Sequence, residues 1–431
     1  MKYSTVLFDL DGTLTRSEAG ITRSALYAAE RMGHTGLTER DFLPFIGPPL
    51  HDSFKRMLGM DDEQAQRATE LYRERFSRVG WAENEVYTGI PALLRSLKKS
   101  GARVAIATAK PQVFAERIAE RFGMSPYLDA IIGPPEGERH ASKADIVRRA
   151  LAQLGGPAVM VGDRCYDVEG GAANGIDTIG VAYGYGTREE LERAGATMVA
   201  DTVEALDALL LGDAPRVRGI FLTMEGMDGC GKTTQREALV QHLEQLGWAV
   251  QVTREPGGDG IAEKIRALIL DPANTQMTDV TEAYLYAASR AQNVRTRIRP
   301  ALERGMAVVC DRFVDSSAAY QGGGRSLGVE RVLSLNAAAV DGETPDITVY
   351  LRMTPEAALA RRLNASEPDR LEREQADFYQ RTFEAYEALF TGEAGARTVS
   401  VDAAQPIEAV TRDMLAAVDA RLSALAAAVK R

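Results

Sequence analysis

A glycine-rich segment, "MEGMDGCGKTTQ" at residues 224–235, constrains the fold of this chain more than any other feature. A strand-like apolar run, Ile220–Met224, leads into it. A helix is predicted after it, because Leu239, Leu243 and Leu246 recur at three- and four-residue spacing. A strand, a glycine turn and a helix start together direct backbone N–H groups at phosphate oxygens. The segment therefore predicts a parallel α/β domain that binds a nucleotide.

The same segment satisfies the pattern G-x-x-x-x-G-K-[ST]. Lys232 is expected to reach the outer phosphates of ATP, and the Thr233 hydroxyl to ligate Mg²⁺. A chance glycine turn is the alternative, and the flanking strand and helix argue against it. The residues expected to surround the nucleotide are Gly226, Met227, Asp228, Gly229, Cys230, Gly231, Lys232, Thr233 and Thr234.

More than two hundred residues precede this segment, and 431 residues are too many for one ordinary hydrophobic core. The only clear break is "LGDAPRVRG", which predicts domains at 1–212 and 219–431 with a linker at 213–218. Short apolar runs alternate with helical patterns in both halves, which favours two three-layer α/β/α domains with parallel sheets. A long helical insertion is expected at about 15–86. The predicted strands are Thr5–Phe8, Arg103–Thr108, Ala130–Ile132, Ala158–Gly162, Thr178–Val181, Ile220–Met224, Ala249–Thr253, Ala307–Cys310 and Ile347–Leu351.

The composition excludes several kinds of partner. A net charge of -10 argues against a surface that binds a nucleic-acid polymer. Three cysteines without metal-like spacing suggest free thiols in a reducing compartment. No segment reads as a signal peptide or membrane span, so we expect a cytoplasmic protein without a membrane partner.

Carboxylates follow the first predicted strand, in "FDLDGTLT". Asp9 and Asp11 are two residues apart, so an extended backbone would point both side chains the same way. This pair alone is equally consistent with an ordinary turn. However, further polar residues follow other predicted strands or begin the next helix, where parallel sheets assemble their sites. These residues are Thr108, Lys143, Asp163 and Asp167.

Together these elements resemble the four motifs of the haloacid dehalogenase superfamily of phosphatases, over about Met1 to Leu211. The resemblance implies a Rossmann-like domain whose helical insertion is a small cap, similar to phosphoglycolate phosphatases or nucleotidases. It implies that Asp9 attacks a phosphate monoester and forms an aspartyl-phosphate, that Asp11 serves as acid and then base, and that Thr108 and Lys143 hold the phosphoryl oxygens. Lys110 and Cys165 are expected to be spectators. The implied Mg²⁺ ligands are Asp9, Asp11, Asp163 and Asp167.

The second half carries a series of segments in the order found in bacterial thymidylate kinase, over Gly219 to Arg431. The resemblance implies a P-loop nucleoside monophosphate kinase fold, ATP-dependent phosphorylation of dTMP to dTDP, and a homodimer formed through this domain. The segments are "MEGMDGCGKTTQ", "REPGGDGIAEKIR", "EAYLYAASRAQ", "VVCDRF", "SSAAYQGGG" and "DRLE".

Phosphoryl transfer needs a second anion site facing the first, and arginines are suited to it. Arg266, Arg290 and Arg312 are therefore candidates to hold the acceptor phosphate and base edge, with Asp311 beside Arg312 at a strand end.

The resemblance assigns further acceptor contacts. Tyr286 would stack on thymine, Arg290 would contact the base, and Tyr320 with Gln321 would line the sugar and base pocket. Asp228 and Glu255 would act through Mg²⁺ or the acceptor. Taken singly, Tyr286 and Tyr320 are better explained as core aromatics, whereas the ordered series of segments favours the pocket role.

The second half departs from the family pattern at two positions. Asp259 stands where a hydroxyl residue is usual, and it would add negative charge near an anion site unless its side chain points away. Gly229 stands where eukaryotic-type enzymes carry an arginine that stabilises the transferring phosphoryl group, so that charge is expected from a lid. The lid candidates are Arg361, Arg362 and Arg370.

These features predict a bifunctional enzyme, a phosphatase for an unidentified monoester joined to a dTMP kinase. The main alternative is a thymidylate kinase whose N-terminal domain only binds a ligand or regulates. A different nucleoside monophosphate at the acceptor site is a further alternative. The pairing also suggests that the phosphatase removes monophosphates that the kinase should not accept.

Overall fold

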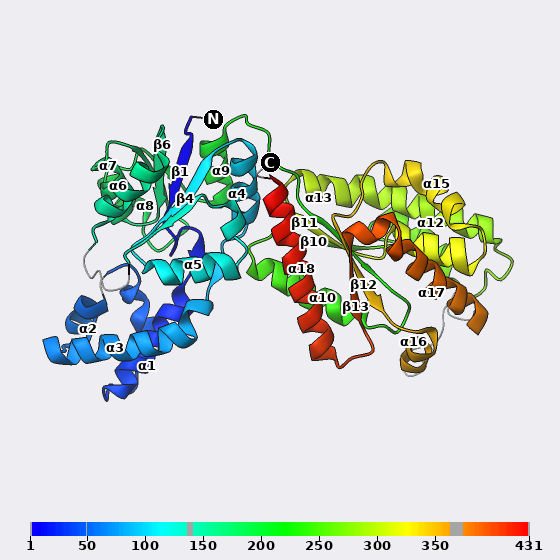
Figure 1. The fold of residues 1–431 in the computed structure, drawn as a ribbon, viewed down its shortest axis with the longest axis horizontal. Helices are drawn as coiled ribbons and strands as arrows, with labels where there is room; N and C mark the ends of the chain where they lie inside the picture. Colours follow the sequence, from blue (N-terminus) through cyan, green and yellow to red (C-terminus); the bar gives the residue numbers. More distant parts are fainter. Residues whose placement is uncertain (1, 49, 136–140, 363–373, 430–431) are drawn as a thin grey trace. The chain divides into compact units, whose positions relative to one another are not determined.

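The computed structural model describes residues 2–48, 50–135, 141–362 and 374–429 of the chain. It divides into two compact units (Figure 1). The first comprises Met1–Arg216 with Gln245–Gly247 and Leu425–Arg431, and the second comprises Val217–Glu244 with Trp248–Ala424. Each unit is an α/β fold built on a parallel sheet.

The first unit contains a six-stranded sheet in the order β5-β4-β1-β6-β7-β8, parallel throughout. The central strand β1 is buried on both faces, because helices cover both sides of the sheet. The strands are β1 (Thr5–Phe8), β4 (Arg103–Ala107), β5 (Ala130–Ile132), β6 (Ala158–Gly162), β7 (Asp177–Val181) and β8 (Met198–Ala200). The helices are α4 (Ile90–Lys99), α5 (Gln112–Arg121), α6 (Lys143–Leu154), α7 (Cys165–Ala172), α8 (Arg188–Arg193) and α9 (Val203–Leu211).

One core of this unit lies between the sheet and α6. Leu7, Ala105 and Met160 of the strands pack against Ile146 and Val147 of the helix. The Ser142 side chain caps α6 by accepting a hydrogen bond from the backbone N–H of Asp145. This cap and the packing together fix the first turn of α6, where Lys143 lies.

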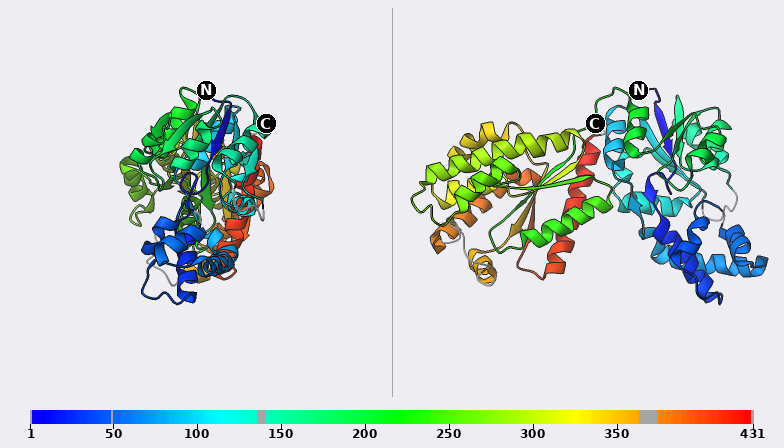
Figure 2. Two further views of the ribbon diagram at one scale, coloured as in Figure 1. Left: turned by 90° about the vertical axis from the view of Figure 1, so that its left-hand side faces the viewer. Right: turned by 180° about the vertical axis from the view of Figure 1, so that it is seen from behind.

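The chain leaves and re-enters this sheet through a short antiparallel ribbon, β2 (Thr15–Arg16) with β3 (Glu85–Val86). Between them lies a helical cap beyond the carboxyl ends of the strands (Figures 1 and 2). Its elements are α1 (Glu18–Arg31), η1 (Glu39–Phe45), α2 (Leu50–Leu58), α3 (Asp62–Arg78) and η2 (Gly80–Ala82).

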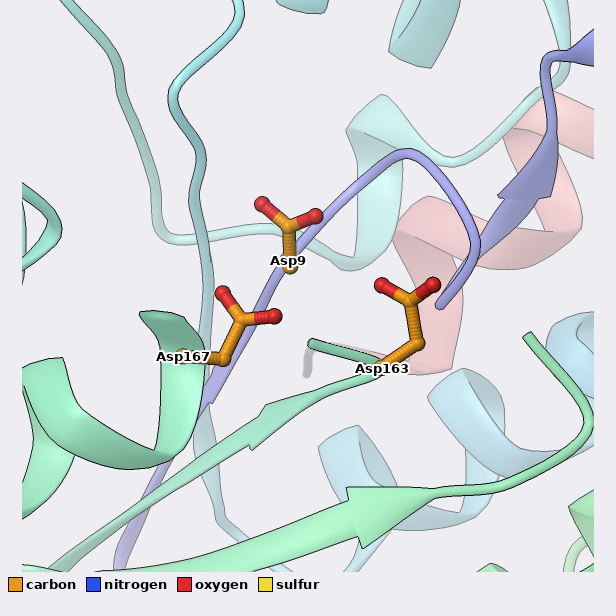
Figure 3. Close-up of side chains that lie close together, drawn as sticks. All are labelled: Asp9, Asp163 and Asp167. Atoms are coloured by element: carbon orange, nitrogen blue, oxygen red, sulfur yellow. The ribbon is translucent and has the colours of Figure 1, made fainter. Parts of the chain in front are cut away.

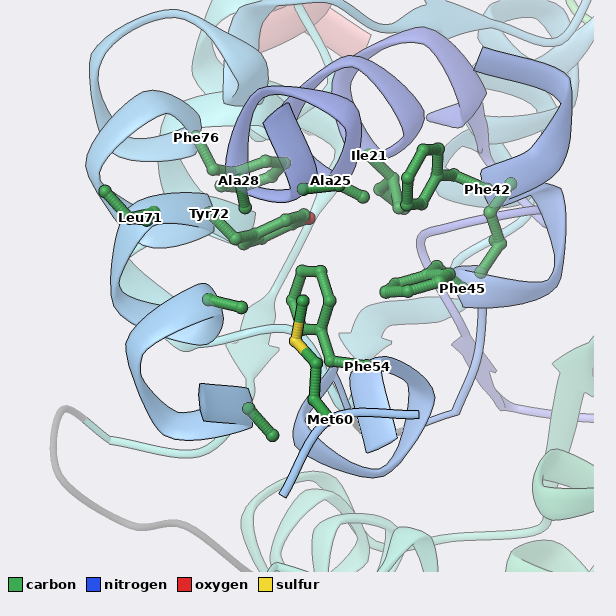
Figure 4. Close-up of a cluster of buried hydrophobic side chains, with 14 residues drawn as sticks. Ile21, Ala25, Ala28, Phe42, Phe45, Phe54, Met60, Leu71, Tyr72 and Phe76 are labelled. Atoms are coloured by element: carbon green, nitrogen blue, oxygen red, sulfur yellow. The ribbon is translucent and has the colours of Figure 1, made fainter. Parts of the chain in front are cut away.

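The cap has its own aromatic core (Figure 4). The ring centroid of Phe45 lies 5.1 Å from that of Phe42 and 4.9 Å from that of Phe54, both edge to face. Each buried phenylalanine contributes about 1.5–3 kcal/mol to folding. The cap is therefore held together by its own packing, and two short strands connect it covalently to the sheet.

The second unit contains a five-stranded parallel sheet in the order β10-β11-β9-β12-β13. Its strands are β9 (Phe221–Glu225), β10 (Val250–Arg254), β11 (Ala307–Asp311), β12 (Ile347–Arg352) and β13 (Thr398–Asp402). Its helices are α10 (Lys232–Gln245), α11 (Gly260–Leu270), α12 (Asp279–Asn293), α13 (Arg299–Glu303), α14 (Val314–Ser317), α15 (Val329–Val340), α16 (Pro355–Arg362), α17 (Ala376–Thr391) and α18 (Ile407–Val429). Two π-helical segments, η4 (Val294–Ile298) and η5 (Ala318–Gly324), follow α12 and α14.

The α/β prediction with parallel sheets is confirmed, and the differences concern short elements. Strands β8 and β13 and the β2–β3 ribbon were not predicted. Strand β4 ends at Ala107, so Thr108 is the first residue after it. Strand β9 includes Glu225, which places that side chain at the strand end. None of the helices in the described ranges is long and apolar enough to cross a membrane.

Candidate functional sites

The first site forms at the carboxyl ends of β4, β1 and β6, which are neighbours in the sheet. Asp9 follows β1, Thr108 follows β4, and Asp163 follows β6. Lys143 begins α6, and Asp167 lies in the first turn of α7. Because these strands run in parallel, their ends meet at one edge, and the structure brings these residues together as the sequence predicted.

Three carboxylates lie at the centre of this site (Figure 3), and one lysine contacts two of them. Ligand oxygens of Asp9, Asp163 and Asp167 lie within 4.8 Å of one another. The Lys143 ammonium lies 2.6 Å from Asp9 Oδ1 and 2.6 Å from Asp167 Oδ1, and donates to the Ala107 carbonyl. Burial alone would lower the pKa of Lys143, but the Asp167 and Asp9 carboxylates outweigh it and raise that pKa.

The carboxylate cluster has excess negative charge. Burial, together with Asp167 and Asp9, raises the pKa of Asp163 well above its usual value. Burial also raises the pKa of Asp167 to about 6, although Lys143 opposes this shift. Asp163 Oδ2 accepts a hydrogen bond from Tyr185 N, whereas Oδ1 is buried with no hydrogen-bond partner among the described residues. An all-oxygen, buried and underneutralised donor set fits Mg²⁺.

Gly12 is required beside this cluster. Its φ is +82°, and a Cβ at this position would lie 2.2 Å from Asp163 Oδ2. Any side chain would therefore occupy the space of the carboxylate.

Asp11 has a different environment from Asp9. Its Oδ2 lies 3.0 Å from the Lys110 ammonium, and its Oδ1 is buried without a hydrogen-bond partner in the described part of the chain. Lys110 is itself buried, 4.8 Å from the ring centroid of Phe76 on the cap helix α3. Asp11 lies outside the three-carboxylate cluster, and Lys110, expected to be a spectator, forms an ion pair with Asp11. The roles of Asp11 as a Mg²⁺ ligand and of Lys110 as a spectator stay predictions.

Two further contacts complete this site. Thr108 is buried, and its Oγ1 accepts a hydrogen bond from Lys110 N at 3.2 Å. Arg164, next to Asp163, donates to the cap at the Ile46 carbonyl at 3.0 Å. The cap thus contacts the sheet domain beside Asp163 through Arg164, and beside Thr108 through Lys110, whose ammonium faces the Phe76 ring.

Cys165 lies next to Arg164 but has no acidic thiol. Burial and the neighbouring Glu190 carboxylate raise the pKa of its thiol. A raised thiol pKa does not suit a nucleophile, which is consistent with the predicted spectator role.

The second site forms at the carboxyl ends of β9 and β11. Gly226, Gly229 and Gly231 have φ values of +139°, +89° and +92°, which favour glycine. Lys232 opens α10 and donates to the carbonyls of Gly226 at 3.0 Å and Met227 at 2.8 Å. Thr233 and Thr234 follow it on the exposed first turn of the helix. The loop and helix start have the arrangement that the sequence predicted.

Arg312 faces this loop from the end of β11. Its Nη2 donates to Asp228 Oδ1 at 2.7 Å and to the Tyr320 hydroxyl at 3.2 Å. The Tyr320 hydroxyl in turn donates to Asp228 Oδ2 at 3.0 Å. Burial would raise the pKa of Asp228, but the Arg312 and Lys232 cations hold it below its usual range. Asp311, one residue before Arg312, lies 3.4 Å from the Arg236 guanidinium.

Arg290 and Glu255 form a buried ion pair. Arg290 Nε lies 2.7 Å from Glu255 Oε2, and the two residues are 1% and 3% exposed. Arg290 also donates to Asn336 Oδ1, the Phe313 carbonyl and Ser317 Oγ. Its donors are thus engaged inside the protein.

The remaining predicted acceptor residues lie around this pair. Tyr286 is half-buried one turn before Arg290 on α12. Gln321 Nε2 donates to Glu282 at 2.9 Å, and its Oε1 is buried without a hydrogen-bond partner within the described ranges. Arg266 donates to the Pro256 carbonyl at 2.8 Å.

Comparison with known proteins gives a separate match for each unit. Residues 224–414 match the thymidylate kinase family model, and residues 6–181 match the model of the haloacid dehalogenase-like hydrolases. The thymidylate kinase of Bacillus pumilus is 46% identical over 200 residues, which is 46% of this chain and 93% of that protein. The chain belongs to the thymidylate kinase family. Its N-terminal unit is a haloacid dehalogenase-like hydrolase domain.

Two solved structures align with the hydrolase unit. A predicted phosphatase from Clostridium acetobutylicum is 42% identical, with a TM-score of 0.46, over 49% of this chain and 99% of its own. A putative phosphatase from Clostridium difficile is 39% identical, with a TM-score of 0.47, over 49% of this chain and 100% of its own.

The two departures from the thymidylate kinase pattern have different outcomes. Asp259 caps α11, accepting hydrogen bonds from the backbone N–H groups of Ile261 and Ala262, while Oδ2 accepts from Gln292 and Thr296. Its negative charge is thus stabilised by the backbone N–H groups and the dipole at the N-terminus of α11.

The lid candidates are only partly described. The Arg361 guanidinium donates to the Ala403 and Ala404 carbonyls. Arg362 ends α16, and its side chain lies outside the described part of the chain, as does the whole of Arg370.

Sequence reasoning missed one buried group of the thymidylate kinase unit. Glu225 ends β9 and contacts Ser316 and Tyr386. A carboxylate at the end of an apolar strand run was the available signal.

Proposed function

We propose that the chain is a bifunctional enzyme. Its kinase unit transfers the terminal phosphoryl group of ATP to dTMP and yields dTDP, and its hydrolase unit cleaves a phosphate monoester through an aspartyl-phosphate. The observation that carries the hydrolase proposal is the convergence of Lys143 on Asp9 and Asp167 beside Asp163. The family match over residues 224–414 carries the kinase proposal.

In the hydrolase reaction, an Asp9 carboxylate oxygen attacks phosphorus and the ester P–O bond breaks, while Asp11 gives its proton to the leaving oxygen. Asp11 then takes a proton from a water that attacks the phosphorus of the aspartyl-phosphate, which releases inorganic phosphate and restores Asp9. Lys143 and Thr108 hold the phosphoryl oxygens. Asp9, Asp163 and Asp167 would hold Mg²⁺, which would supply the positive charge that lets a phosphate dianion approach the carboxylates.

In the kinase reaction, a phosphate oxygen of dTMP attacks the terminal phosphorus of ATP, and the bond to the ADP oxygen breaks. Lys232 and the loop N–H groups hold the ATP phosphates, with Thr233 suited to Mg²⁺. Arg312 turns from Asp228 to the acceptor phosphate. Tyr286, Tyr320 and Gln321 form the sugar and base pocket, with Arg266, Asp311 and the Glu255–Arg290 pair around it.

The hydrolase proposal is tested with Asp9→Asn in the full chain. The amide lacks the nucleophilic charge, so hydrolysis of a panel of phosphate monoesters is expected to disappear while dTMP phosphorylation is unchanged. Beryllium fluoride, which mimics an acyl-phosphate, should protect the wild-type unit from thermal unfolding and leave the variant unaffected. Absence of turnover on every ester with the wild-type chain would instead favour a unit that only binds a ligand or regulates.

The kinase proposal is tested by comparing dTMP, dUMP and dCMP as acceptors in a coupled ADP assay. We expect kcat/KM to be highest for dTMP. A higher value for dUMP or dCMP would identify a different acceptor. Hydrolysis of dTMP by the hydrolase unit should be slow, since otherwise the two units would oppose each other.

We also propose a homodimer through the kinase unit. Large apolar side chains are exposed on two of its helices, Ile261 and Leu268 on α11 with Val280 and Tyr284 on α12. Four such side chains on adjacent helices suit a self-associating surface. Sedimentation should show a dimer for wild type and a monomer for Tyr284→Lys. Ile407→Lys, at an equally exposed apolar position at the start of α18, should remain dimeric.

A further inference from the structure

A buried carboxylate lies directly behind the nucleotide loop, and the kinase reaction described above does not use it. Glu225 ends β9 immediately before Gly226, and it is fully buried. Its Oε1 accepts a hydrogen bond from Phe313 N at 2.8 Å. Its Oε2 accepts from Ser316 Oγ at 2.5 Å and from the Tyr386 hydroxyl at 3.0 Å.

The same two hydroxyls also contact Arg312. Arg312 Nη1 donates to Ser316 Oγ at 3.1 Å and to the Tyr386 hydroxyl at 3.4 Å. The other terminal nitrogen, Nη2, faces Asp228. Ser316 and Tyr386 therefore stand between the carboxylate of Glu225 and the guanidinium that faces the nucleotide loop.

The direction of each hydrogen bond depends on the charge of Glu225. Arg312 has only donors, so both hydroxyls must present lone pairs to it. The two hydroxyl oxygens also lie 2.8 Å from each other. An ionised Glu225 accepts both hydroxyl protons, or one of them while the other hydroxyl donates to its neighbour, and in each arrangement hydroxyl lone pairs are left for Arg312. A protonated Glu225 adds a donor where the hydroxyl protons now point and removes the negative charge that faces the guanidinium.

Glu225 also supports the backbone at Arg312. Arg312 has φ of +68°, in the left-handed region that non-glycine residues rarely adopt. Such a conformation persists only where neighbouring contacts enforce it. Arg312 N donates to the Met224 carbonyl at 3.0 Å, and the next amide, Phe313 N, donates to Glu225. The end of β9 thus holds this turn on both sides.

We propose that Glu225 is a positioning residue of the kinase reaction, which holds Arg312 toward the nucleotide loop through Ser316, Tyr386 and Phe313 N. The role of Arg312 at the acceptor phosphate rests on the proposed function. Glu225 itself touches no substrate, and its effect is exerted through Arg312.

The surroundings of Glu225 place its titration near neutral pH. Burial and the Asp315 carboxylate on α14 raise its pKa to about 7, against the opposing effects of Ser316 and Arg312. Asp315 is itself paired with Arg397, 2.8 Å away. On α17, the group that faces Glu225 is the Tyr386 phenol, whose own pKa is raised by burial and by Glu225. The ionised, positioning form of Glu225 is therefore gained as pH rises through about 7.

The test uses the full chain with Glu225→Gln, Tyr386→Phe and Ser316→Ala. Tyr350→Phe is the matched control, because its ring stacks 5.3 Å from that of Tyr386 while its hydroxyl contacts Glu387 instead. We measure kcat and the KM values for dTMP and ATP between pH 6 and 9, and the thermal unfolding of each variant.

At pH 8, kcat/KM for dTMP should fall about tenfold in Tyr386→Phe and Ser316→Ala and further in Glu225→Gln, since hydrogen bonds to charged groups are lost. KM for ATP should stay within about twofold, because the Lys232 contacts are untouched. Wild-type kcat/KM for dTMP should rise through pH 7, and Glu225→Gln should lose that rise. Tyr350→Phe should match wild type.

The proposal is overturned if Glu225→Gln has the same pH profile and the same kcat/KM for dTMP as the wild type. It is also overturned if kcat/KM for dTMP and KM for ATP change equally. If Glu225→Gln does not fold, Tyr386→Phe and Ser316→Ala test the proposal instead. The same comparison applies, namely the change in kcat/KM for dTMP against the change in KM for ATP. If the wild-type chain prefers dUMP or dCMP, the proposed acceptor is wrong, and the same ratios measured with the preferred acceptor test Glu225 separately.

Discussion

The two sites of this chain arrange buried charge in opposite ways. In the hydrolase unit, three carboxylates lie close together and one ammonium, Lys143, contacts two of them, so the cluster lacks positive charge. In the kinase unit, Lys232 already donates to loop carbonyls and Arg312 to Asp228. Under the proposed function, a cation would neutralise the first site, whereas at the second an anionic substrate would displace the internal partners of Lys232 and Arg312. The two sites thus differ in whether positive charge is missing or is already present and paired within the protein.

The largest expected effect tests whether each cation serves only its own unit. Lys143→Met should lower phosphate ester hydrolysis at least about a thousandfold, because three buried carboxylates then face the phosphate without the ammonium. Kinase turnover should be unchanged. The reciprocal variant, Lys232→Met, should abolish kinase turnover and leave hydrolysis intact. A loss of both activities in either variant would break the comparison.

A second experiment separates structural from exchangeable cations in the kinase unit. Arg290→Met should destabilise that unit by about 3–5 kcal/mol, because it leaves the Glu255 carboxylate buried and unpaired. The double variant Arg290→Met with Glu255→Met should regain most of this loss. Urea denaturation measures both. Unchanged stability in the single variant would show that the Glu255–Arg290 pair is not a structural tie.

The unmet charge of the hydrolase unit should be visible in stability. Burial raises the pKa of Asp163, so the folded state binds that proton more tightly than the unfolded chain. Stability of the metal-free unit should therefore fall as pH rises above about 4, the usual pKa of an aspartate. In Asp163→Asn this fall should be smaller.

Mg²⁺ should restore the stability lost in the wild-type unit. At one hundred times its Kd, Mg²⁺ should add about 2.7 kcal/mol to wild type and clearly less to Asp163→Asn. Calorimetry across pH, with and without Mg²⁺, measures both effects. If Mg²⁺ does not stabilise the wild-type unit, the carboxylate cluster does not need a cation, and the contrast between the two sites is wrong.

The smallest effect concerns Lys110, whose ammonium faces Asp11 and the cap ring of Phe76. If Lys110 orients Asp11 for proton donation, Lys110→Met should lower hydrolysis of an alkyl phosphate about tenfold. The loss should be smaller for p-nitrophenyl phosphate, whose leaving group needs no proton. Lys110→Arg keeps the charge and should retain most activity. Equal losses on both esters would exclude a role through Asp11.

Sequence patterns predicted those parts of the sites that follow from strand ends. Asp9, Thr108 and Asp163 were placed together because parallel neighbouring strands end at one edge, and Lys143 and Asp167 begin the helices that return to it. Lys110 was given no role, although Asp11 and Lys110 both follow the ends of neighbouring strands, β1 and β4. Its second partner, Phe76, lies on the cap helix α3, which strand-end reasoning does not place. The position of a contact between segments this far apart in the sequence is set by tertiary packing.

The kinase site shows the same limit. The glycine pattern predicted the loop around Lys232, because its chemistry is local. Anion-site chemistry and the family resemblance singled out Arg290 as an acceptor contact, but they gave no indication that its donors are taken up inside the protein. Strands β8 and β13 were missed since a three-residue run and a half-exposed alternating run give weak signals.

A tryptophan next to the two-strand ribbon that joins the cap to the sheet can serve as a fluorescent probe of the cap. The chain contains two tryptophans, and one of them, Trp81, lies in η2 just before β3. Its indole is covered by the Arg117 guanidinium of α5, 3.9 Å from the ring centroid. Any swing of the cap about the ribbon separates this stacked pair and changes the polarity around the indole. With Trp248→Phe, Trp81 is the one remaining tryptophan, and tryptophan fluorescence during turnover would report any movement of the cap relative to α5.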